Sequence, residues 1–180
     1  MSYGEFLARE DISFTASEVL EDYRIWCEES EDLRGYRPNT DYDPVFMMGE
    51  GSYRKVQLTN DGVEAELIQQ GYMMCGDLHL TSCGSGGCFS EIIFDGLGYN
   101  IRGRPFLLLP EPSYEGLGDN NKMTAIIAWW GYGGSCHTQE DEETDPLHTL
   151  KPSSCLLTAQ YDSRSGRLVF QHDYRLWPER

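Results

Sequence analysis

Apolar residues recur at helical spacing close to the start of the chain. In the segment "FTASEVLEDYRIWCEESEDLRG", residues 14–35, they are Val19, Leu20, Tyr23, Trp26 and Cys27. This spacing puts them on one side of an α-helix, and Thr15 followed by Glu18 is a capping-box pattern that marks a helix start. We predict an amphipathic helix from about Thr15 to about Leu33. Val19, Tyr23 and Trp26 are expected to pack on a sheet, so that Trp26→Asp would abolish folding.

The pattern changes to alternation after residue 52. The segments "YRKVQLT" and "VEAELIQQ" alternate apolar with polar residues and are separated by "NDG", which predicts a β-hairpin. Further strands are expected in "CFSEIIF", "PFLLLP", "MTAIIAWW", "SCLLTAQYD" and "RLVFQHDY". The stretches "DGLG", "SYEGLGDNN" and "DSRSG" read as turns between strands.

A helix followed by a series of short strands predicts an α+β fold, with the amphipathic helix packed on a mainly antiparallel, meandering sheet. The 180 residues fit a single domain spanning 1–180. We expect residues 1–14 to be disordered or extended. Residues 137–152, "HTQEDEETDPLHTLKP", are polar and aperiodic, and we expect a long acidic surface loop there.

Six cysteines, an even number, favour a disulfide-stapled domain. The segment "CGDLHLTSCGSGGC" alone contains three of them. Sequence cannot choose among the fifteen possible connectivities, but the spacings suggest three bridges. These are Cys83–Cys88, which would close a glycine-rich loop, Cys136–Cys155, which would clamp the acidic loop, and Cys27–Cys75, which is what remains. We predict at least two disulfides.

Two alternatives to the disulfides stay open. Cys75, His79, Cys83 and Cys88 are zinc-type ligands in one compact stretch, although their C-x3-H-x3-C-x4-C spacing matches no zinc knuckle or ribbon. The cysteines could instead be free, buried thiols of a cytoplasmic protein. A C-x-x-C redox motif is absent, and "GSGG" precedes a predicted strand rather than the helix of a phosphate-binding loop. We expect neither a metal nor another cofactor.

The segment "LTNDGVEAELI", then Cys75, then "CGSGGC", then Cys136 and Cys155 resembles a group of small secreted proteobacterial proteins of uncharacterised function. Those proteins carry a D-x-N-x-D-G turn in a hairpin before a C-G-[ST]-G-G-C segment. The resemblance covers roughly residues 53–160 and implies a periplasmic or secreted, disulfide-bonded domain, without implying an activity. Where the full turn would ligate calcium, this chain has Gln57 and Thr59 and keeps only Asp61 and Gly62, so we expect no calcium site.

The charge balance is strongly acidic. Thirty Asp and Glu stand against fourteen Lys and Arg, for a net charge of -16 at pH 7. A nucleic acid or an anionic membrane would be repelled by such a surface, and a basic protein is the complementary partner. No apolar run is long enough to span a membrane, and "MSYGEFLARE" is no signal peptide. With its cysteines, the protein is expected to be periplasmic or secreted after signal removal, the alternative being cytoplasmic.

The sequence contains no legible catalytic constellation. The four histidines are scattered, no serine lies in G-x-S-x-G, and the adjacent Cys136 and His137 would point to opposite faces of a strand. We therefore favour a non-enzymatic acidic binding protein, an inhibitor or immunity protein for a basic enzyme or toxin. The alternative is a secreted hydrolase with an acid-lined cleft.

The predicted binding residues fall into three groups. On the helix they are Glu28, Glu29 and Glu31; in the acidic loop they are Glu140, Asp141, Glu142 and Glu143; on and after a strand they are Trp129, Trp130 and Tyr132. The carboxylates would attract a basic partner, and the aromatic side chains would supply an apolar anchor.

Overall fold

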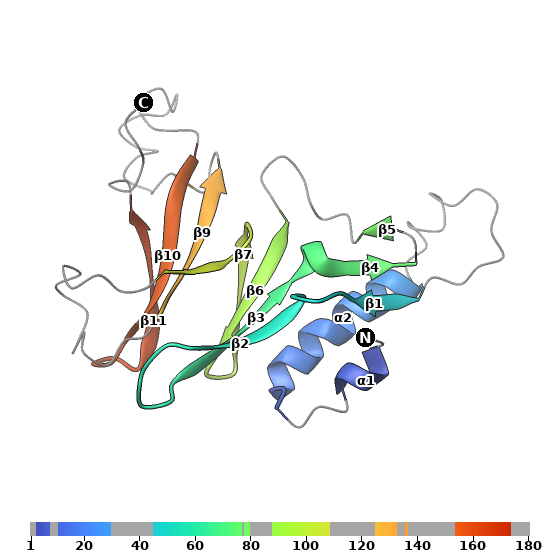
Figure 1. Cartoon of the computed structure of the whole chain (residues 1–180), viewed down its shortest axis with the longest axis horizontal. Coiled ribbons are helices and arrows are strands. Elements are labelled where there is room, and N and C mark those ends of the chain that lie inside the picture. Colours follow the sequence, from blue (N-terminus) through green and yellow to red (C-terminus); the bar gives the residue numbers. More distant parts are fainter. Residues whose placement is uncertain are drawn as a thin grey trace. The chain divides into compact units, whose positions relative to one another are not determined.

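The computed structural model describes residues 3–7, 11–29, 45–76, 78–79, 88–108, 125–132, 136 and 154–173. The chain divides into two compact units. Unit 1 comprises residues 1–55, 66–84 and 88–101, and unit 2 comprises residues 56–65, 85–87 and 102–180. The fold is α+β, as predicted, and its elements are shown in Figure 1. Nothing tests the expectation of a single domain, which stays a prediction.

Two helices belong to unit 1, α1 (Tyr3–Leu7) and α2 (Phe14–Glu29). Ser13 caps α2, because its Oγ accepts a hydrogen bond of 3.1 Å from the backbone N–H of Ala16. The predicted cap was Thr15, but the Thr15 hydroxyl donates instead to the carbonyl of Gly96 at 3.1 Å. The predicted helix end near Leu33 lies outside the described residues.

The strands form three antiparallel sheets within the described part of the chain. The first has the order β1 (Phe46–Met48), β4 (Met73–Cys75), β5 (Leu78–His79). The second has the order β2 (Tyr53–Gln57), β3 (Glu64–Gln69), β6 (Phe89–Phe94), β7 (Leu97–Arg102). The third has the order β11 (Arg167–Asp173), β10 (Ser154–Asp162), β9 (Ile126–Tyr132), β8 (Phe106–Leu108), and it is the expected meander of consecutive strands. A short 3₁₀ helix, η1 (Gln70–Tyr72), joins β3 to β4.

The predicted hairpin of residues 53–70 is confirmed as β2 and β3. Strand β7 was missed, because "LGYNIR" includes glycine and asparagine, which are rare in strands. Its pairing partner is set by the turn before it. Asp95 and Gly96 have φ of 50° and 72°, the two successive left-handed residues that a tight hairpin turn requires. The Asp-Gly dipeptide thus turns the chain back from β6 into β7.

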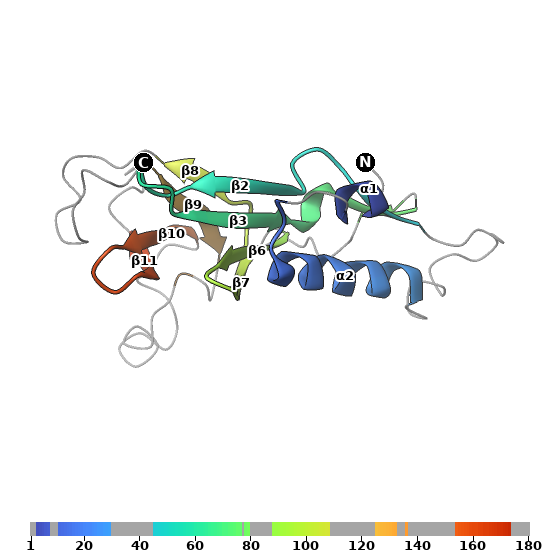
Figure 2. The same cartoon turned by 90° about the horizontal axis from the view of Figure 1, so that it is seen from below.

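The core of unit 1 lies between the helices and the strands. Figure 2 shows α2 running along the strands of this unit. The buried residues of this core are Phe6, Ala16, Leu20, Cys27, Phe46, Met48, Tyr53, Ile68, Met73, Cys75 and Ile93. Burial of Phe6 ties α1 to this core, so the expected disorder or extended conformation of residues 1–14 is wrong for Tyr3–Leu7.

The buried side of α2 differs in one residue from the apolar side that the sequence predicts. Ala16, Leu20 and Cys27 are buried, and Val19 and Tyr23 pack partly against the core, as expected. Trp26, however, is 39% exposed. Cys27 follows Leu20 by seven positions, nearly two full turns, so these two buried residues define the side of the helix that faces the core. Trp26 lies about 100° away from Cys27 around the helix axis and turns outward.

Glu66 on β3 joins the start of α2 to the sheet of unit 1. The carboxylate is buried and accepts hydrogen bonds from the backbone N–H of Ser13 at 2.9 Å, from the Ser13 hydroxyl, and from the Tyr53 hydroxyl at 2.5 Å. Three donors offset the cost of burying this charge. The carboxylate also lies at the N-terminal end of α2, where the helix dipole favours negative charge.

Disulfides are confirmed by the structure. Cys27–Cys75 joins α2 to β4 within unit 1, and Cys136–Cys155 is the corresponding bridge of unit 2. Cys88 is also disulfide-bonded, whereas Cys83, its predicted partner, lies outside the described residues. The two bridges match the predicted connectivity, and the alternative of free buried thiols is wrong for these five cysteines.

Candidate functional site

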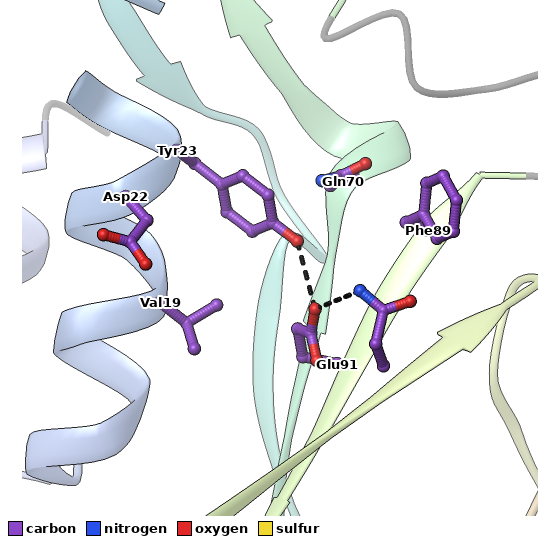
Figure 3. Close-up of a pocket in the computed structure, with 7 residues that line it drawn as sticks. Val19, Asp22, Tyr23, Gln70, Phe89 and Glu91 are labelled. Carbon is purple, nitrogen blue, oxygen red and sulfur yellow. Dashed lines mark hydrogen bonds between the residues drawn. The ribbon is translucent and has the colours of Figure 1, made fainter. Parts of the chain in front are cut away.

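A cavity of about 260 Å³ lies within unit 1, between α2 and the strands β6 and β7. Its lining residues are Val19, Asp22 and Tyr23 of α2, Gln70 of η1, Phe89 and Glu91 of β6, and Asn100 of β7. Figure 3 shows Tyr23 reaching from α2 toward Glu91, with Gln70 and Phe89 on the strand side. None of these seven residues was among the predicted site residues. Their separation of up to 81 positions along the chain left no local motif to recognise.

Glu91 is the central polar group of this cavity. Its Oε1 accepts a hydrogen bond of 2.6 Å from Asn100 Nδ2 and a longer one of 3.5 Å from the Tyr23 hydroxyl (Figure 3). Both bonds end on the same oxygen, so within the described part of the chain Oε2 accepts none. Glu66, on the neighbouring strand, receives three donors on its two oxygens. Glu91 is therefore a buried carboxylate with spare acceptor capacity.

Burial is the largest cause of the pKa shifts of Glu91 and Tyr23. Loss of water raises the pKa of Glu91 above its ordinary value, and the hydrogen bonds from Asn100 and Tyr23 only partly oppose that rise. Burial, together with the neighbouring Glu91 charge, also raises the pKa of Tyr23 well above its ordinary value. The tyrosine hydroxyl thus remains a neutral hydrogen-bond donor.

The side-chain oxygen of Gln70, Oε1, also accepts no hydrogen bond within the described part of the chain. The residue is 6% exposed. Its Oε1 is buried and accepts no hydrogen bond from any described residue. A buried acceptor left unpaired costs about 1–3 kcal/mol. This oxygen is enclosed by the protein, so its missing hydrogen bond is a cost within the fold and does not add an acceptor to the open cavity.

An exposed stripe of α2 runs alongside the cavity. Its members, all exposed, are Phe14, Glu18, Asp22, Ile25, Trp26 and Glu29, and they are hereafter called the α2 stripe. Most of them follow one another at intervals of three or four residues, close to one helical turn, so they lie on one side of the helix. The α2 stripe combines three carboxylates with three large apolar side chains and includes no basic residue. Asp22 belongs both to the α2 stripe and to the cavity.

Arg24, the basic residue of α2, is engaged within the helix. It contacts Glu21 with two nitrogens, at 2.5 and 2.9 Å, and also pairs with Glu28. These contacts lower the pKa of Glu21 to about 2, with the hydrogen bonds from Arg24 as the largest cause. Glu28 also accepts from the backbone N–H of Phe46 at 3.3 Å. Glu28, a predicted partner contact, is thus committed to contacts within the protein.

The structure separates the other predicted contacts. Glu29 is exposed on α2, and Glu31 lies outside the described residues, as do Glu140, Asp141, Glu142 and Glu143. Trp129 is buried and packs edge-to-face on Phe170 with ring centroids 6.3 Å apart. Trp130, its neighbour on β9, is 36% exposed. The side chain of Tyr132 is not described. Trp26, which was assigned to the core, is the exposed tryptophan beside carboxylates.

The structure also bears on the zinc alternative. Cys75 is bonded to Cys27, and Cys88 is disulfide-bonded. A sulfur in a disulfide is not a thiolate and does not ligate zinc as one. The side chains of His79 and Cys83 lie outside the described part of the chain. Among the described residues, no group of three or more His, Cys, Asp and Glu is placed to hold a metal ion.

We expect Glu91→Gln to stabilise the protein at neutral pH. Because the folded chain holds the Glu91 proton more tightly than the unfolded chain, stability falls as pH rises from the ordinary carboxyl pKa through the raised one. Glutamine keeps the oxygen that accepts from Asn100 and Tyr23 but carries no charge to bury. Thermal melts from pH 4 to pH 8 should show the variant above wild type at pH 7 and level with it at pH 4. Glu18→Gln, on the exposed side of α2, is the control, and equal pH profiles for Glu91→Gln and wild type would contradict the expectation.

Comparison with known proteins adds no relative. The chain matches no protein-family model, no curated protein and no solved structure. Across the described ranges, no helix is long and apolar enough to cross a lipid bilayer. Conclusions about function therefore depend on the residues of this chain.

Proposed function

We propose that this protein is a non-enzymatic acidic binding protein that acts as an inhibitor or immunity protein for a basic enzyme or toxin. The observation that carries this proposal is the α2 stripe, in which carboxylates lie on both sides of the exposed Ile25 and Trp26 along one side of a helix. Tryptophan at the centre of an interface commonly supplies a large share of the binding energy. Carboxylates around it would select a basic partner.

The charge of the whole chain supports the same partner. A net charge of -16 would accelerate encounter with a basic protein and disfavour acidic ones. Arg24 does not neutralise the α2 stripe, because it is held by Glu21 and Glu28. The negative potential beside Trp26 is thus left for a partner.

We further propose a periplasmic or secreted location. The disulfides Cys27–Cys75 and Cys136–Cys155 are consistent with an oxidising compartment, where such bonds form and persist. The proposed targets, basic secreted enzymes and toxins, occur in the same surroundings. The resemblance to small secreted proteobacterial proteins supports this location.

In this cavity, a hydrolase would have to use the carboxylates Asp22 and Glu91, since the lining includes no serine, cysteine, histidine or lysine. Nothing else in the described part of the cavity favours this alternative. Turnover of a substrate by wild type that is lost in Glu91→Gln would be evidence for it.

The test is binding to a panel of purified basic secreted enzymes, including a glycoside hydrolase, a ribonuclease and a protease, with acidic enzymes as negative controls. We expect one basic member to bind and to lose activity. Trp26→Ala should weaken that complex by about thirtyfold or more, the effect of removing a central interface tryptophan. Raising the salt concentration should slow association, because screening shortens the range of the charges.

Trp130→Ala is the matched control, since Trp130 is exposed to a similar extent (36% against 39%) but belongs to unit 2 and is not a member of the α2 stripe. It should change the affinity less than threefold. Equal effects of the two tryptophan substitutions, or no binding to any basic enzyme at low salt, would contradict the proposal.

A further inference from the structure

We infer that the Glu91 cavity receives one arginine side chain of the basic partner. The inference rests on the proposed function and specifies the group that this site recognises. Its basis is the buried carboxylate of Glu91, whose Oε2 accepts no hydrogen bond within the described part of the chain, in one small cavity that the exposed carboxylate of Asp22 also lines.

The lining requires a ligand that donates hydrogen bonds. Glu91 offers an oxygen without a donor among the described residues, and Asp22 adds an exposed carboxylate at the same cavity. The groups that donate here are already used, because Asn100 donates to Glu91 and Tyr23 donates to the same oxygen. An anion would meet two carboxylates and is excluded. A cation with several N–H groups satisfies each of the open acceptors.

Arginine fits these acceptors better than lysine does. Its guanidinium presents five N–H donors in a fixed plane, which suits oxygens at several fixed positions. The ring of Phe89 also lines the cavity, and a guanidinium interacts favourably with an aromatic ring. The volume of about 260 Å³ is below the range of pockets that enclose whole drug-sized molecules, and it suits one side chain.

Asp22 links this cavity to the surface proposed for the partner. It lines the cavity and is a member of the α2 stripe, one helical turn from Trp26. A partner seated on the stripe would therefore have the cavity beside it. An inserted arginine would give the interface a charged anchor next to the tryptophan.

The experiment is an NMR titration of the ¹⁵N-labelled full chain with N-acetyl-arginine amide, a probe of the side chain alone. We expect saturable shifts confined to residues of the cavity and affinity about tenfold or more weaker in Glu91→Gln. Glu18→Gln, which removes a carboxylate of the stripe outside the cavity, should bind the probe as wild type does. The citrulline analogue, uncharged and of similar shape, should not bind, and the lysine analogue should bind more weakly than arginine.

Probe binding should also tighten as pH rises from 5 to 8. A bound cation favours the ionised form of Glu91, which burial disfavours in the free protein. Asp22 and Tyr23 of α2 face the same cavity, and Glu66 lies on the neighbouring strand, bonded to Ser13 and Tyr53. Loss of the pH dependence in Glu91→Gln would assign it to Glu91 among these groups. The melting curve of each variant verifies that it is folded.

Failures of the two proposals can be told apart. If a basic enzyme binds wild type and Glu91→Gln equally and the probe does not bind, the arginine cavity is overturned and the binding function stands. If the probe binds as expected but no basic enzyme does, the cavity stands and the inhibitor function fails. Probe binding that is unchanged in Glu91→Gln, or equal for arginine and citrulline, overturns the inference.

Discussion

Replacement of both Cys27 and Cys75 by alanine is expected to lower the free energy of unfolding by about 4 kcal/mol. The two residues are 48 positions apart, and a cross-link that closes a loop of this length removes about that much conformational free energy from the unfolded chain. Both sulfurs are buried in the core of unit 1, so their loss also removes packing contacts. For a domain whose total stability is of the usual 5–15 kcal/mol, this is a large share.

Urea unfolding under non-reducing conditions measures the effect. The matched comparison is the double substitution of Cys136 and Cys155, whose loop of 19 residues predicts a smaller loss of about 3 kcal/mol. A reducing agent should destabilise wild type by more than either pair of substitutions. If removal of Cys27–Cys75 left the unfolding midpoint unchanged, this bridge would not be what stabilises unit 1.

Leu20→Ala is expected to cost 2–5 kcal/mol, roughly the cost of a cavity in a packed core. Leu20 is fully buried against the strands of unit 1. Trp26→Asp, by contrast, should cost only about 1 kcal/mol, because Trp26 is 39% exposed and an aspartate there remains in water. This reverses the expectation from sequence, in which Trp26 was a core residue.

Circular dichroism melts of the two variants test this ranking directly. Leu20→Ala should melt well below wild type, and Trp26→Asp should melt within a few degrees of it. If the Trp26→Asp variant failed to fold, Trp26 would be a core residue after all, and the α2 stripe could not be the binding surface proposed here. Stability and binding are therefore separable at this position, since Trp26→Asp should abolish partner binding in a folded protein.

Glu66 and Glu91, both buried in unit 1, show how the surroundings of two similar residues can suit one to structure and the other to binding. Glu66 has three donors from Ser13 and Tyr53 and fixes the start of α2. Glu91 has two donors on one oxygen and borders a cavity. A saturated carboxylate contributes to the fold, whereas a partly satisfied one retains the capacity to bind a ligand.

Local pattern determined much of the fold. The 3.6-residue period of residues 14–29, the alternation around "NDG" and the turn at "DSRSG" predicted α2, the β2–β3 hairpin and the β10–β11 hairpin, which the structure confirms. Short strands escaped, because β1 and β4 have three residues each, too few to show a period. The even cysteine count predicted disulfides for a chemical reason that does not depend on the fold.

Tertiary structure alone decided the site. Helical periodicity places Trp26 about 100° from Cys27 around the helix axis. Only the packing of the strands against Leu20 and Cys27 decides that Trp26 faces water. Likewise Tyr23, Gln70, Glu91 and Asn100 carry no mutual signal in the sequence, since four separate elements bring them together. Periodicity is a property of neighbouring residues, whereas burial and unpaired hydrogen bonds depend on which distant segments meet. The sequence therefore determined α2, the two hairpins, the cysteine chemistry and the charge of this protein. The packing of α2 on the strands of unit 1 decided which acidic and aromatic side chains of this helix are exposed.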